Sequence, residues 1–427
     1  MNKYFLLDNR EKVFFKIPKG WILSTHFMPE RKSAEENIQD MLQRALSSPI
    51  SSPPLKETIK PQGRVALLVD DGTRPTPVHL ILPPLLAVIH DLGVPQDQVD
   101  IILALGTHAR LSQEEIERRL GSEVYRNYRI TQHDSRAPDL VPVGVLEGSP
   151  VKINALAACA DVKIGIGTIL PHPCGFGGGP KIVMPGISDF ESIMEHHLSH
   201  LDHPSSHIGM IEGNPFYEGM AKTARMAGLN CIINCIVDGF EQIIDIVFGD
   251  PLEAHKAGVE RGGAFYQVPI KEEADLTLIS AYPHNHGPQI FKPLIPASHA
   301  TKEGGTIIMV AHCQGGLPPF FINILEKIRT EARNDLQGFV KECLKERKPV
   351  LPEASIDFNM AIFSLFLHTG NISIILVCPD IRKRDIERMG FEAEESLQDA
   401  ISREAKRRPN ATLNIFPAGG VLVPIKS

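Results

Sequence analysis

Nearly continuous apolar runs alternate with longer amphipathic stretches over most of this chain. The runs lie at 64–69, 99–105, 162–169, 274–281 and 306–311. Because turn residues bound them, they predict buried parallel strands. The stretches between them have apolar positions at helical spacing, and Ser112 with Glu115 predicts a capping box at the start of one helix. Strands and helices that alternate in this way indicate an α/β fold.

The remaining segments add elements at both ends of this pattern. The turn residues at 8–10 separate two short apolar segments, at 4–7 and 12–17, and so predict a hairpin. A linker rich in Ser and Pro follows at 47–54. Further elements are predicted as a helix at 34–47, a strand pair at 240–248, helices over 321–347 and a last helix at 396–407.

Composition narrows the possible partners and locations. The net charge of −7, without a long basic run, argues against a nucleic-acid partner. The seven cysteines form no Cys-x-x-Cys pair, so neither a zinc ribbon nor a disulfide framework is indicated, and reduced thiols favour the cytoplasm. The first thirty residues lack an apolar signal segment, and no apolar run reaches the roughly eighteen residues of a membrane span. We therefore expect a cytoplasmic protein without a membrane partner.

Polar and reactive residues follow the predicted strands at the point where each strand ends. They are Asp71, Arg74, His108, His133 and His172. Because ligands of α/β proteins bind at the carboxyl ends of parallel strands, we expect these side chains to converge on one site. We expect His133 and Asp134 to form a hydrogen-bonded pair that supports the site.

The segment from Gly165 to His203 concentrates further candidate chemistry. It contains Gly177, Gly178 and Gly179, then Lys181, and then a helix expected to open at Pro185-Gly186 and to carry His196, His197 and His200. Glycines let backbone N–H groups approach an anion, and a helix N-terminus adds partial positive charge. The lysine precedes Ile182 and not Ser or Thr, so this is not a Walker A loop. The segment predicts a cofactor site with a phosphate and a metal.

The length of 427 residues exceeds what one hydrophobic core usually supports, so we expect two α/β domains with mainly parallel sheets. We place an N-terminal cofactor-binding domain at 1–270 and a C-terminal domain at 271–405. We expect the tail at 406–427 to pack back on the N-terminal domain, and the active site to lie in the cleft between the two domains.

The motifs occur in a defined order along the chain. They are Asp71-Gly72-Thr73-Arg74-Pro75-Thr76-Pro77, Gly106-Thr107-His108, His133-Asp134, Pro171-His172, the glycine loop to Lys181, Pro185-Gly186 and His197. In order, spacing and placement at strand ends, this set resembles the nickel-pincer lactate racemase family from about residue 10 to about residue 320. Each motif alone would be a weak signal, but the combination is specific.

The resemblance implies a cofactor and a role for each matching residue. The cofactor is a pyridinium-3-thioamide-5-thiocarboxylic acid mononucleotide that holds nickel as a pincer. Lys181 matches the lysine that forms the covalent thioamide link, and His197 matches the nickel ligand, with His196 as the alternative. His108 and His172 match the general base and general acid. The other implied contacts are Gly177, Gly178, Gly179, Asp71 and Thr73 with the cofactor, Asp71 and Arg74 with the substrate carboxylate, and Gln289 and Lys292 with both.

The implied activity is racemisation or epimerisation of a 2-hydroxy acid by reversible hydride transfer to this cofactor, so the expected partner is a small-molecule substrate. Two histidines on opposite sides suit inversion, since one base cannot serve both enantiomers. The oligomeric state stays open. Two alternatives also stay open, a net oxidoreductase that releases the keto acid and a catalytically silent nucleotide- or anion-binding homologue.

Two features of the second domain depart from the family's pattern. His284 and His286 precede Gln289, and the only tryptophan is Trp21, near the N-terminus. Because the second domain is where the substrate's side chain would be recognised, we expect a 2-hydroxy acid other than lactate, with a larger or polar side chain.

Overall fold

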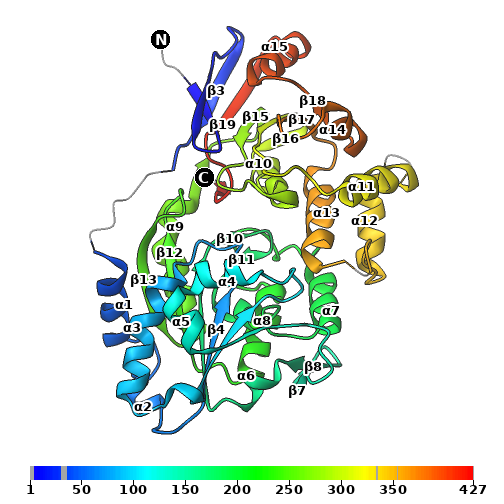
Figure 1. The fold of residues 1–427 in the computed structure, drawn as a ribbon. Coiled ribbons are helices and arrows are strands. Elements are labelled where there is room, and N and C mark those ends of the chain that lie inside the picture. The colour runs from blue at the N-terminus through cyan, green and yellow to red at the C-terminus, as the bar shows by residue number, and fades with distance from the viewer. Residues whose placement is uncertain (1–3, 30–35, 333–334, 353, 427) are drawn as a thin grey trace. The chain divides into compact units, whose positions relative to one another are not determined.

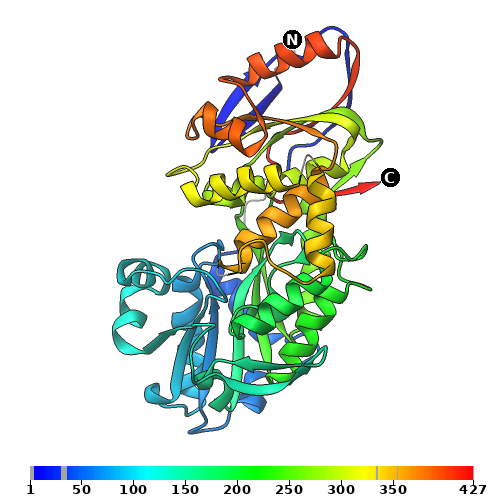
Figure 2. The ribbon, with the colours of Figure 1, turned by 90° about the vertical axis from the view of Figure 1, so that its right-hand side faces the viewer.

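The computed structural model of the chain describes residues 4–29, 36–332, 335–352 and 354–426 (Figure 1). It contains two compact units. Arg31–Ala264 form one unit, called the central unit below. Met1–Glu30 and Phe265–Ser427 together form the other, called the terminal unit because it includes both chain ends. The predicted α/β class with mainly parallel sheets is confirmed (Figure 2).

The limits of the two units differ from the predicted domains. β3 (Trp21–His26) pairs in parallel with β19 (Ala411–Phe416) in the sheet of the terminal unit. The assignment of 1–270 to one domain was therefore wrong for the first thirty residues. The tail at 406–427 likewise belongs to the terminal unit, where its strands pair with Trp21–His26 and with Gln267–Ile270. A local apolar pattern specifies a strand but not its partner, and these two partners lie hundreds of residues apart in the sequence.

The central unit is built on a six-stranded sheet in the order β13-β12-β9-β4-β5-β6. Its strands are β4 (Val65–Asp70), β5 (Val99–Ala104), β6 (Arg129–Gln132), β9 (Val162–Ile169), β12 (Cys231–Val237) and β13 (Ile243–Gly249). All neighbours are parallel except β12 and β13. The predicted strand pair at 240–248 is the single strand β13, because residues 239–240 form the turn before it. A hairpin of β7 (Val141–Leu146) and β8 (Ser149–Ile153) lies outside this sheet.

Helices bury both faces of this sheet, which explains the continuous apolar runs. In β4, Val65, Leu67 and Val69 pack into one core, whereas Ala66 and Leu68 pack into the core on the opposite face. Complete burial of such a side chain contributes roughly 1.5–3 kcal/mol. The helices are α1 (Ile38–Ser47), α2 (Leu55–Thr58), α3 (Val78–Asp91), α4 (Gln113–Leu120), α5 (Ser122–Asn127), α6 (Ala155–Cys159), α7 (Phe190–His200), α8 (Pro215–Met226) and α9 (Glu253–Tyr266).

Two helix predictions in this unit can be compared with the structure directly. α4 begins with the predicted capping box, in which Ser112 and Glu115 exchange side-chain and backbone hydrogen bonds. α1 begins at Ile38, where the side chain of Asn37 accepts a hydrogen bond from the backbone of Asp40. The helix predicted at 34–47 is therefore confirmed from residue 38 onward, and residues 34–35 lie outside the described part of the chain.

The terminal unit has a six-stranded parallel sheet in the order β18-β17-β16-β15-β19-β3. Its further strands are β15 (Ala274–Ser280), β16 (Thr301–Val310), β17 (Ser373–Val377) and β18 (Glu392–Ala393), with the separate pairs β1 (Tyr4–Asp8) with β2 (Glu11–Phe15) and β14 (Gln267–Ile270) with β20 (Val423–Lys426). Its helices are α10 (Leu294–His299), α11 (Pro319–Glu331), α12 (Leu336–Lys345), α13 (Ile356–Thr369), α14 (Lys383–Met389) and α15 (Leu397–Arg407).

The terminal unit agrees with most of the sequence predictions. The N-terminal hairpin is confirmed as β1 and β2, and the last helix as α15. The helical region at 321–347 is made of two helices, α11 and α12. Among the described residues of the whole chain, no helix has the length and apolar character that crossing a membrane requires.

Candidate active site

The ends of two neighbouring strands bring Asp71 and His108 into contact. β4 and β5 pair in parallel, so the residues that follow them leave the sheet at the same edge. His108 Nδ1 lies within hydrogen-bonding distance of the carboxylate of Asp71. An ionised carboxylate only accepts, so the imidazole donates its Nδ1 proton. This leaves Nε2 of a neutral His108 with the lone pair that can take a proton.

Asp71 is buried but remains ionised. Burial alone would raise its pKa, but His108, Arg74 and a hydrogen bond from Thr73 outweigh burial and hold the pKa of Asp71 well below its usual range. The backbone N–H and the hydroxyl of Thr73 donate to Oδ1 at 2.8 and 2.5 Å. The contacts of Thr73 therefore fix the carboxylate that in turn orients His108.

Most hydrogen-bond donors of the Arg74 side chain are not used by other described residues. Its guanidinium reaches only Thr73 among the described residues, at 3.3 Å to the hydroxyl and 3.5 Å to the carbonyl oxygen. Both contacts are long for a charge-assisted hydrogen bond. A planar guanidinium whose donors are largely uncommitted suits bidentate binding of a carboxylate.

Asp70, which the sequence analysis did not single out, anchors the same turn. Its carboxylate forms an ion pair with Arg119 of α4 and accepts a hydrogen bond from the hydroxyl of Thr76 at 2.5 Å. Arg119 Nε also donates to the backbone carbonyl of Asp70 at 2.8 Å. The hydroxyl of Thr168, at the end of β9, lies 2.6 Å from that of Thr76. The only signal in the sequence was the acidic doublet, because the arginine comes from a distant helix.

His172 reaches the same edge of the sheet from β9. It belongs to the short strand β10 (Pro171–His172), which pairs with β11 (Gly175–Phe176) just beyond β9. The backbone N–H of Cys174 donates to His172 Nδ1 at 3.2 Å, so a neutral His172 carries its proton on Nε2. Asn214 holds this turn, since its buried side chain donates to the carbonyl of Cys174 at 2.9 Å.

The glycine loop, Gly177–Gly179, is held by the protein itself. The N–H of Gly177 donates to the carbonyl of Leu170 at 2.8 Å, and the N–H of Gly179 donates to Asn234 Oδ1 at 2.7 Å. His255 Nε2 donates to the carbonyl of Gly177 at 2.9 Å. Two of the three N–H groups expected to face an anion are therefore engaged within the fold.

Lys181 follows this loop within a single 3-10 turn, Gly179–Ile182. Burial, together with the nearby Arg74, lowers the pKa of Lys181 to about 8, although Cys174 and Asp71 act in the opposite direction. The charges of Arg74 and Asp71 therefore both act on this amine. A side chain with this pKa has a substantial neutral, nucleophilic fraction near neutral pH.

α7 begins later than predicted. Its N-cap is Asp189, whose side chain accepts from the backbone N–H of Ser192 at 3.0 Å, so the prediction that Pro185-Gly186 opens the helix was wrong. Gly186 instead lies in a packed turn, where its carbonyl accepts from Gly106 at 2.9 Å. An added Cβ at Gly186 would lie 2.1 Å from the carbonyl oxygen of Ile182. The glycine is required by this close approach.

The histidines of α7 differ in what their ring nitrogens contact. His197 Nδ1 donates to the carbonyl of Ile193 at 2.8 Å, which leaves its Nε2 with the lone pair. In His196, Nε2 donates to the carbonyl of Phe216 at 2.9 Å and Nδ1 lies 3.3 Å from His197 Nδ1. His200 pairs with a carboxylate of the β7–β8 hairpin. His197 therefore keeps the lone pair of Nε2, whereas Nε2 of His196 is used by Phe216 and Nε2 of His200 by the carboxylate.

His197 also has the protonation state of a ligand. Burial, with His196 and Lys181 nearby, keeps the pKa of His197 well below its ordinary value, so the imidazole is neutral. Neutral imidazole is the form that binds metals. The described residues contain no group of three or more His, Cys, Asp or Glu that could hold a metal ion by themselves. A metal bound by His197 would therefore need other ligands from outside the protein.

His133 supports α7 from the end of β6. Its buried ring donates from Nε2 to the carbonyl of Ser188 at 2.9 Å, directly before the N-cap Asp189. Asp134 is exposed and accepts from the backbone N–H of Arg136 at 2.9 Å. No hydrogen bond joins His133 to Asp134 among the described residues, so the predicted pair does not form and His133 supports the site alone.

The remaining predicted residues belong to the terminal unit. Gln289 and Lys292 lie in and next to the 3-10 turn Gly287–Phe291, and Lys292 Nζ donates to Gln289 Oε1 at 3.2 Å. His284 Nε2 donates to the carbonyl of Gly420 at 3.0 Å, which links the ends of β15 and β19. His284 therefore has a structural partner, whereas His286 is exposed.

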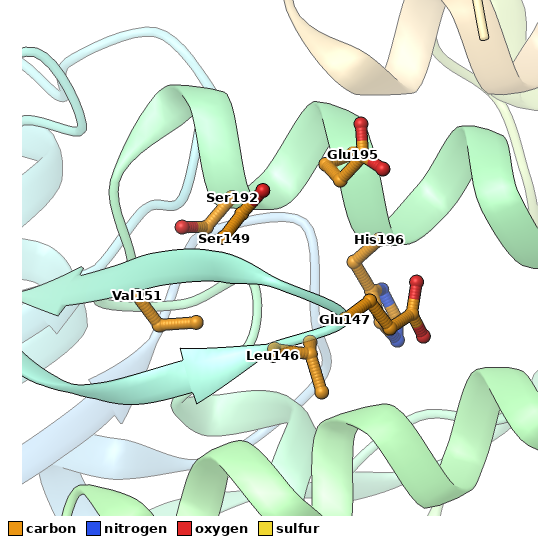
Figure 3. A pocket seen from close by; sticks show the side chains of 7 residues that line it. All are labelled: Leu146, Glu147, Ser149, Val151, Ser192, Glu195 and His196. Atoms are coloured by element: carbon orange, nitrogen blue, oxygen red, sulfur yellow. The ribbon is translucent and has the colours of Figure 1, made fainter.

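A small pocket lies beside α7 but contains none of the predicted catalytic residues (Figure 3). It is lined by Leu146, Glu147, Ser149, Val151, Ser192, Glu195 and His196. Figure 3 shows that these side chains come from α7 and from the β7–β8 hairpin. The pocket is thus bounded by His196, whose ring donates to the carbonyl of Phe216, and neither Lys181 nor His197 lines it.

Comparisons with known proteins identify relatives of this chain. Residues 9–209 match the family model described as the lactate racemase N-terminal domain. A lactate racemase from Lactiplantibacillus plantarum is 30% identical over 397 residues, which cover 90% of this chain and 91% of the relative. A lactate racemase from Thermoanaerobacterium thermosaccharolyticum is 31% identical over 285 residues, which cover 65% and 66%.

Solved structures give the same result. The structure of the lactate racemase apoprotein from Thermoanaerobacterium thermosaccharolyticum matches with a TM-score of 0.86 and 25% identity, covering 100% of both chains. The crystal structure of a Thermotoga maritima protein matches with a TM-score of 0.66 and 20% identity, over 93% of this chain and 100% of that one, and shows the shared fold alone. The chain therefore belongs to the lactate racemase family and is an enzyme of the isomerase class.

Proposed function

We propose that this protein racemises or epimerises a 2-hydroxy acid, lactate or a close relative, with a nickel-pincer nucleotide attached to Lys181. The observation that carries the proposal is the placement of His108, His172, Asp71 and Lys181 at one edge of the central sheet. The names of the two relatives support lactate as the first substrate to test.

The residues fit the proposed cofactor in two respects. Lys181 has a lowered pKa, as covalent attachment through a neutral amine requires. His197 presents Nε2 of a neutral ring whose Nδ1 is held by Ile193, which is the usual arrangement of a histidine ligand. No group of three or more His, Cys, Asp or Glu among the described residues could hold a metal ion, which suits a metal whose further ligands belong to the cofactor.

The cofactor, when bound, supplies reversible acceptance of the hydride from the substrate's hydroxyl-bearing carbon. The protein's own groups handle the carboxylate and the proton. Arg74 binds the carboxylate in bidentate fashion and so determines which substrate face is presented. His108 Nε2 takes the hydroxyl proton, and Asp71 stabilises the imidazolium that forms. His172 Nε2 exchanges the corresponding proton for the other enantiomer.

Intact-mass and metal analysis provide the direct test. The chain is co-expressed with the enzymes that make the cofactor, and the purified protein should carry nickel and a mass addition that peptide mapping assigns to Lys181. Lys163 is the matched control, because burial lowers the pKa of its amine too, but Nζ donates to the carbonyl of Ala160 at 2.8 Å. Finding neither nickel nor adduct under these conditions would refute the proposal.

Two substitutions separate covalent attachment of the cofactor from catalytic turnover. Lys181→Ala should abolish the mass addition, whereas His108→Ala should retain it and lose turnover. Racemisation of enantiopure lactate without an external electron acceptor distinguishes a racemase from a net oxidoreductase. A protein that carries the adduct and accumulates keto acid only when an electron acceptor is supplied would be an oxidoreductase, and one that carries neither nickel nor adduct would be the silent homologue.

A further inference from the structure

Two buried side chains hold the glycine loop from opposite directions. Asn234 Oδ1 accepts from the N–H of Gly179 at 2.7 Å, and His255 Nε2 donates to the carbonyl of Gly177 at 2.9 Å. Asn234 is 2% exposed and His255 is completely buried. Neither residue touches the groups that exchange protons, so neither has a role in the mechanism above.

Asn234 is an unusual residue at its position. It occupies the middle of β12, whose other residues are apolar, and pairs with Gly167 of β9. Burial of an amide is unfavourable unless its polar atoms are hydrogen-bonded. Its Nδ2 donates to the carbonyl of Ile233 at 3.0 Å, and its Oδ1 is used by Gly179. The loop is therefore the partner that compensates for burial of this amide in the sheet.

His255 is oriented by a second buried group. A carbonyl only accepts, so the proton of His255 is on Nε2 and its Nδ1 carries the lone pair. The hydroxyl of Tyr217 lies 3.2 Å from that Nδ1 and donates to it. The Tyr217 ring stacks on the imidazole, with centroids 5.6 Å apart and planes at 15°. Tyr217 of α8 and His255 of α9 therefore form one hydrogen-bonded chain that ends on Gly177.

The glycines fit these two side chains closely. An added Cβ at Gly179 would lie 2.4 Å from Cγ of His255, and one at Gly178 would lie 2.9 Å from Asn234 Oδ1. Both glycines also have positive φ, 80° at Gly178 and 54° at Gly179. The absence of side chains in this loop is thus required by Asn234 and His255, whatever the loop contacts on its other side.

The position of the glycine loop directly affects that of Lys181. The backbone N–H of Lys181 donates to the carbonyl of Gly178 at 3.1 Å, and Pro180 between them has a fixed φ. We infer that His255 and Asn234 are positioning residues that hold the glycine loop and so set where the amine of Lys181 is presented. This inference rests on the proposed role of Lys181 in cofactor attachment.

The test compares His255→Gln with His255→Leu. A glutamine amide can still donate to the carbonyl of Gly177, whereas leucine has a similar volume and no donor. In the apoprotein, trace acetylation of Lys181 with acetic anhydride across pH 6–10, read by peptide mass spectrometry, gives the reactivity and pKa of its amine. Lys163 serves as the internal control.

We expect His255→Leu to raise the pKa of Lys181 from about 8 towards the ordinary lysine value, and His255→Gln to leave it near 8. In protein co-expressed with the cofactor-making enzymes, the adduct should fall about 10-fold in His255→Leu and persist in His255→Gln. Thermal unfolding shows that each variant is folded. If His255→Leu does not fold, Tyr217→Phe replaces it and should shift Lys181 in the same direction.

The outcomes separate the two proposals. A folded His255→Leu, or Tyr217→Phe in its place, with wild-type reactivity of Lys181 would overturn the positioning role. A shifted Lys181 in the apoprotein would support that role even if the wild-type protein never acquires an adduct. In that case the proposal of cofactor attachment is refuted, and the proposal that His255 and Asn234 position Lys181 is retained.

Discussion

Asp71→Asn is the substitution that tests the proton-transfer geometry most directly. The carboxylate accepts the Nδ1 proton of His108 on one oxygen, and the N–H and hydroxyl of Thr73 on the other. An asparagine can keep its oxygen towards Thr73, but its NH₂ then faces His108. An NH₂ group only donates, so His108 must adopt the tautomer with the proton on Nε2. That nitrogen then no longer has the lone pair needed to take a proton from the substrate.

The expected loss of turnover follows from this change of the His108 tautomer. Where the orienting aspartate of a catalytic histidine is replaced by asparagine, turnover falls by about 10⁴, and we expect a loss of roughly 10³- to 10⁴-fold here. The assay is racemisation of enantiopure lactate by cofactor-loaded protein, followed by chiral chromatography. Nickel content and the adduct on Lys181 should remain at wild-type levels, because Asp71 does not attach the cofactor in the proposal.

Stability gives an independent measurement of the same contact. Loss of one charge-assisted hydrogen bond should lower the free energy of unfolding by about 1.5–3 kcal/mol. The pKa of Asp71 is lower in the folded protein than its unfolded value of about 3.9, so its stabilisation is present above that pH and lost as the pH falls below it. Asp71→Asn should therefore weaken the dependence of stability on pH below about pH 4.

Asp134→Asn is the matched control, since that carboxylate is exposed at the end of a neighbouring strand and accepts only from the backbone of Arg136 among the described residues. It should leave turnover unchanged. The reasoning would be refuted by an Asp71→Asn enzyme that carries the adduct and retains turnover within 10-fold of wild type.

Two further predictions concern the packing behind the glycine loop. Gly179→Ala should destabilise the protein by about 1–3 kcal/mol more than Gly148→Ala in urea unfolding. Both glycines have positive φ, but Gly148 has no atom within 4 Å of an added Cβ. Equal effects would show that the His255 side chain can move away from an added Cβ without cost. Burial lowers the pKa of His255 to about 4. Between pH 6.5 and pH 4 this histidine is therefore protonated in the unfolded chain but neutral in the folded protein. The free energy of unfolding should fall by on the order of 3 kcal/mol over that range. The loss should be smaller in His255→Gln, and an unchanged slope would contradict the burial of a neutral ring.

The strands and the chemistry at their ends could be predicted because each has a local signal. β4 and β5 are apolar on both faces, and parallel strands place Asp71 and His108 at one edge without knowledge of any other contact. The capping box at Ser112 and Glu115 was likewise a matter of spacing within one helical turn. These strands and this capping box were confirmed because periodicity and spacing within one turn are local signals.

Contacts between distant segments had no such signal. The pairing of β3 with β19 depends on two segments at opposite ends of the chain. Asn234 lies in an otherwise apolar strand, and His255 lies in a helix. Their importance comes from the loop that they contact, 55 and 78 residues away in the sequence. No pattern within either segment could have revealed it.

The glycine loop shows how one pattern can have two physical causes. From the sequence, three glycines before a lysine indicated a loop whose N–H groups face an anion. In the structure, Gly177 and Gly179 use those groups internally, and the space that side chains would need is filled by Asn234 and His255. A glycine run permits close approach on either side of the backbone, and here the side facing the protein is occupied. In our proposal the loop is therefore a support that presents Lys181, and the N–H groups of Gly177 and Gly179 are not available to a phosphate.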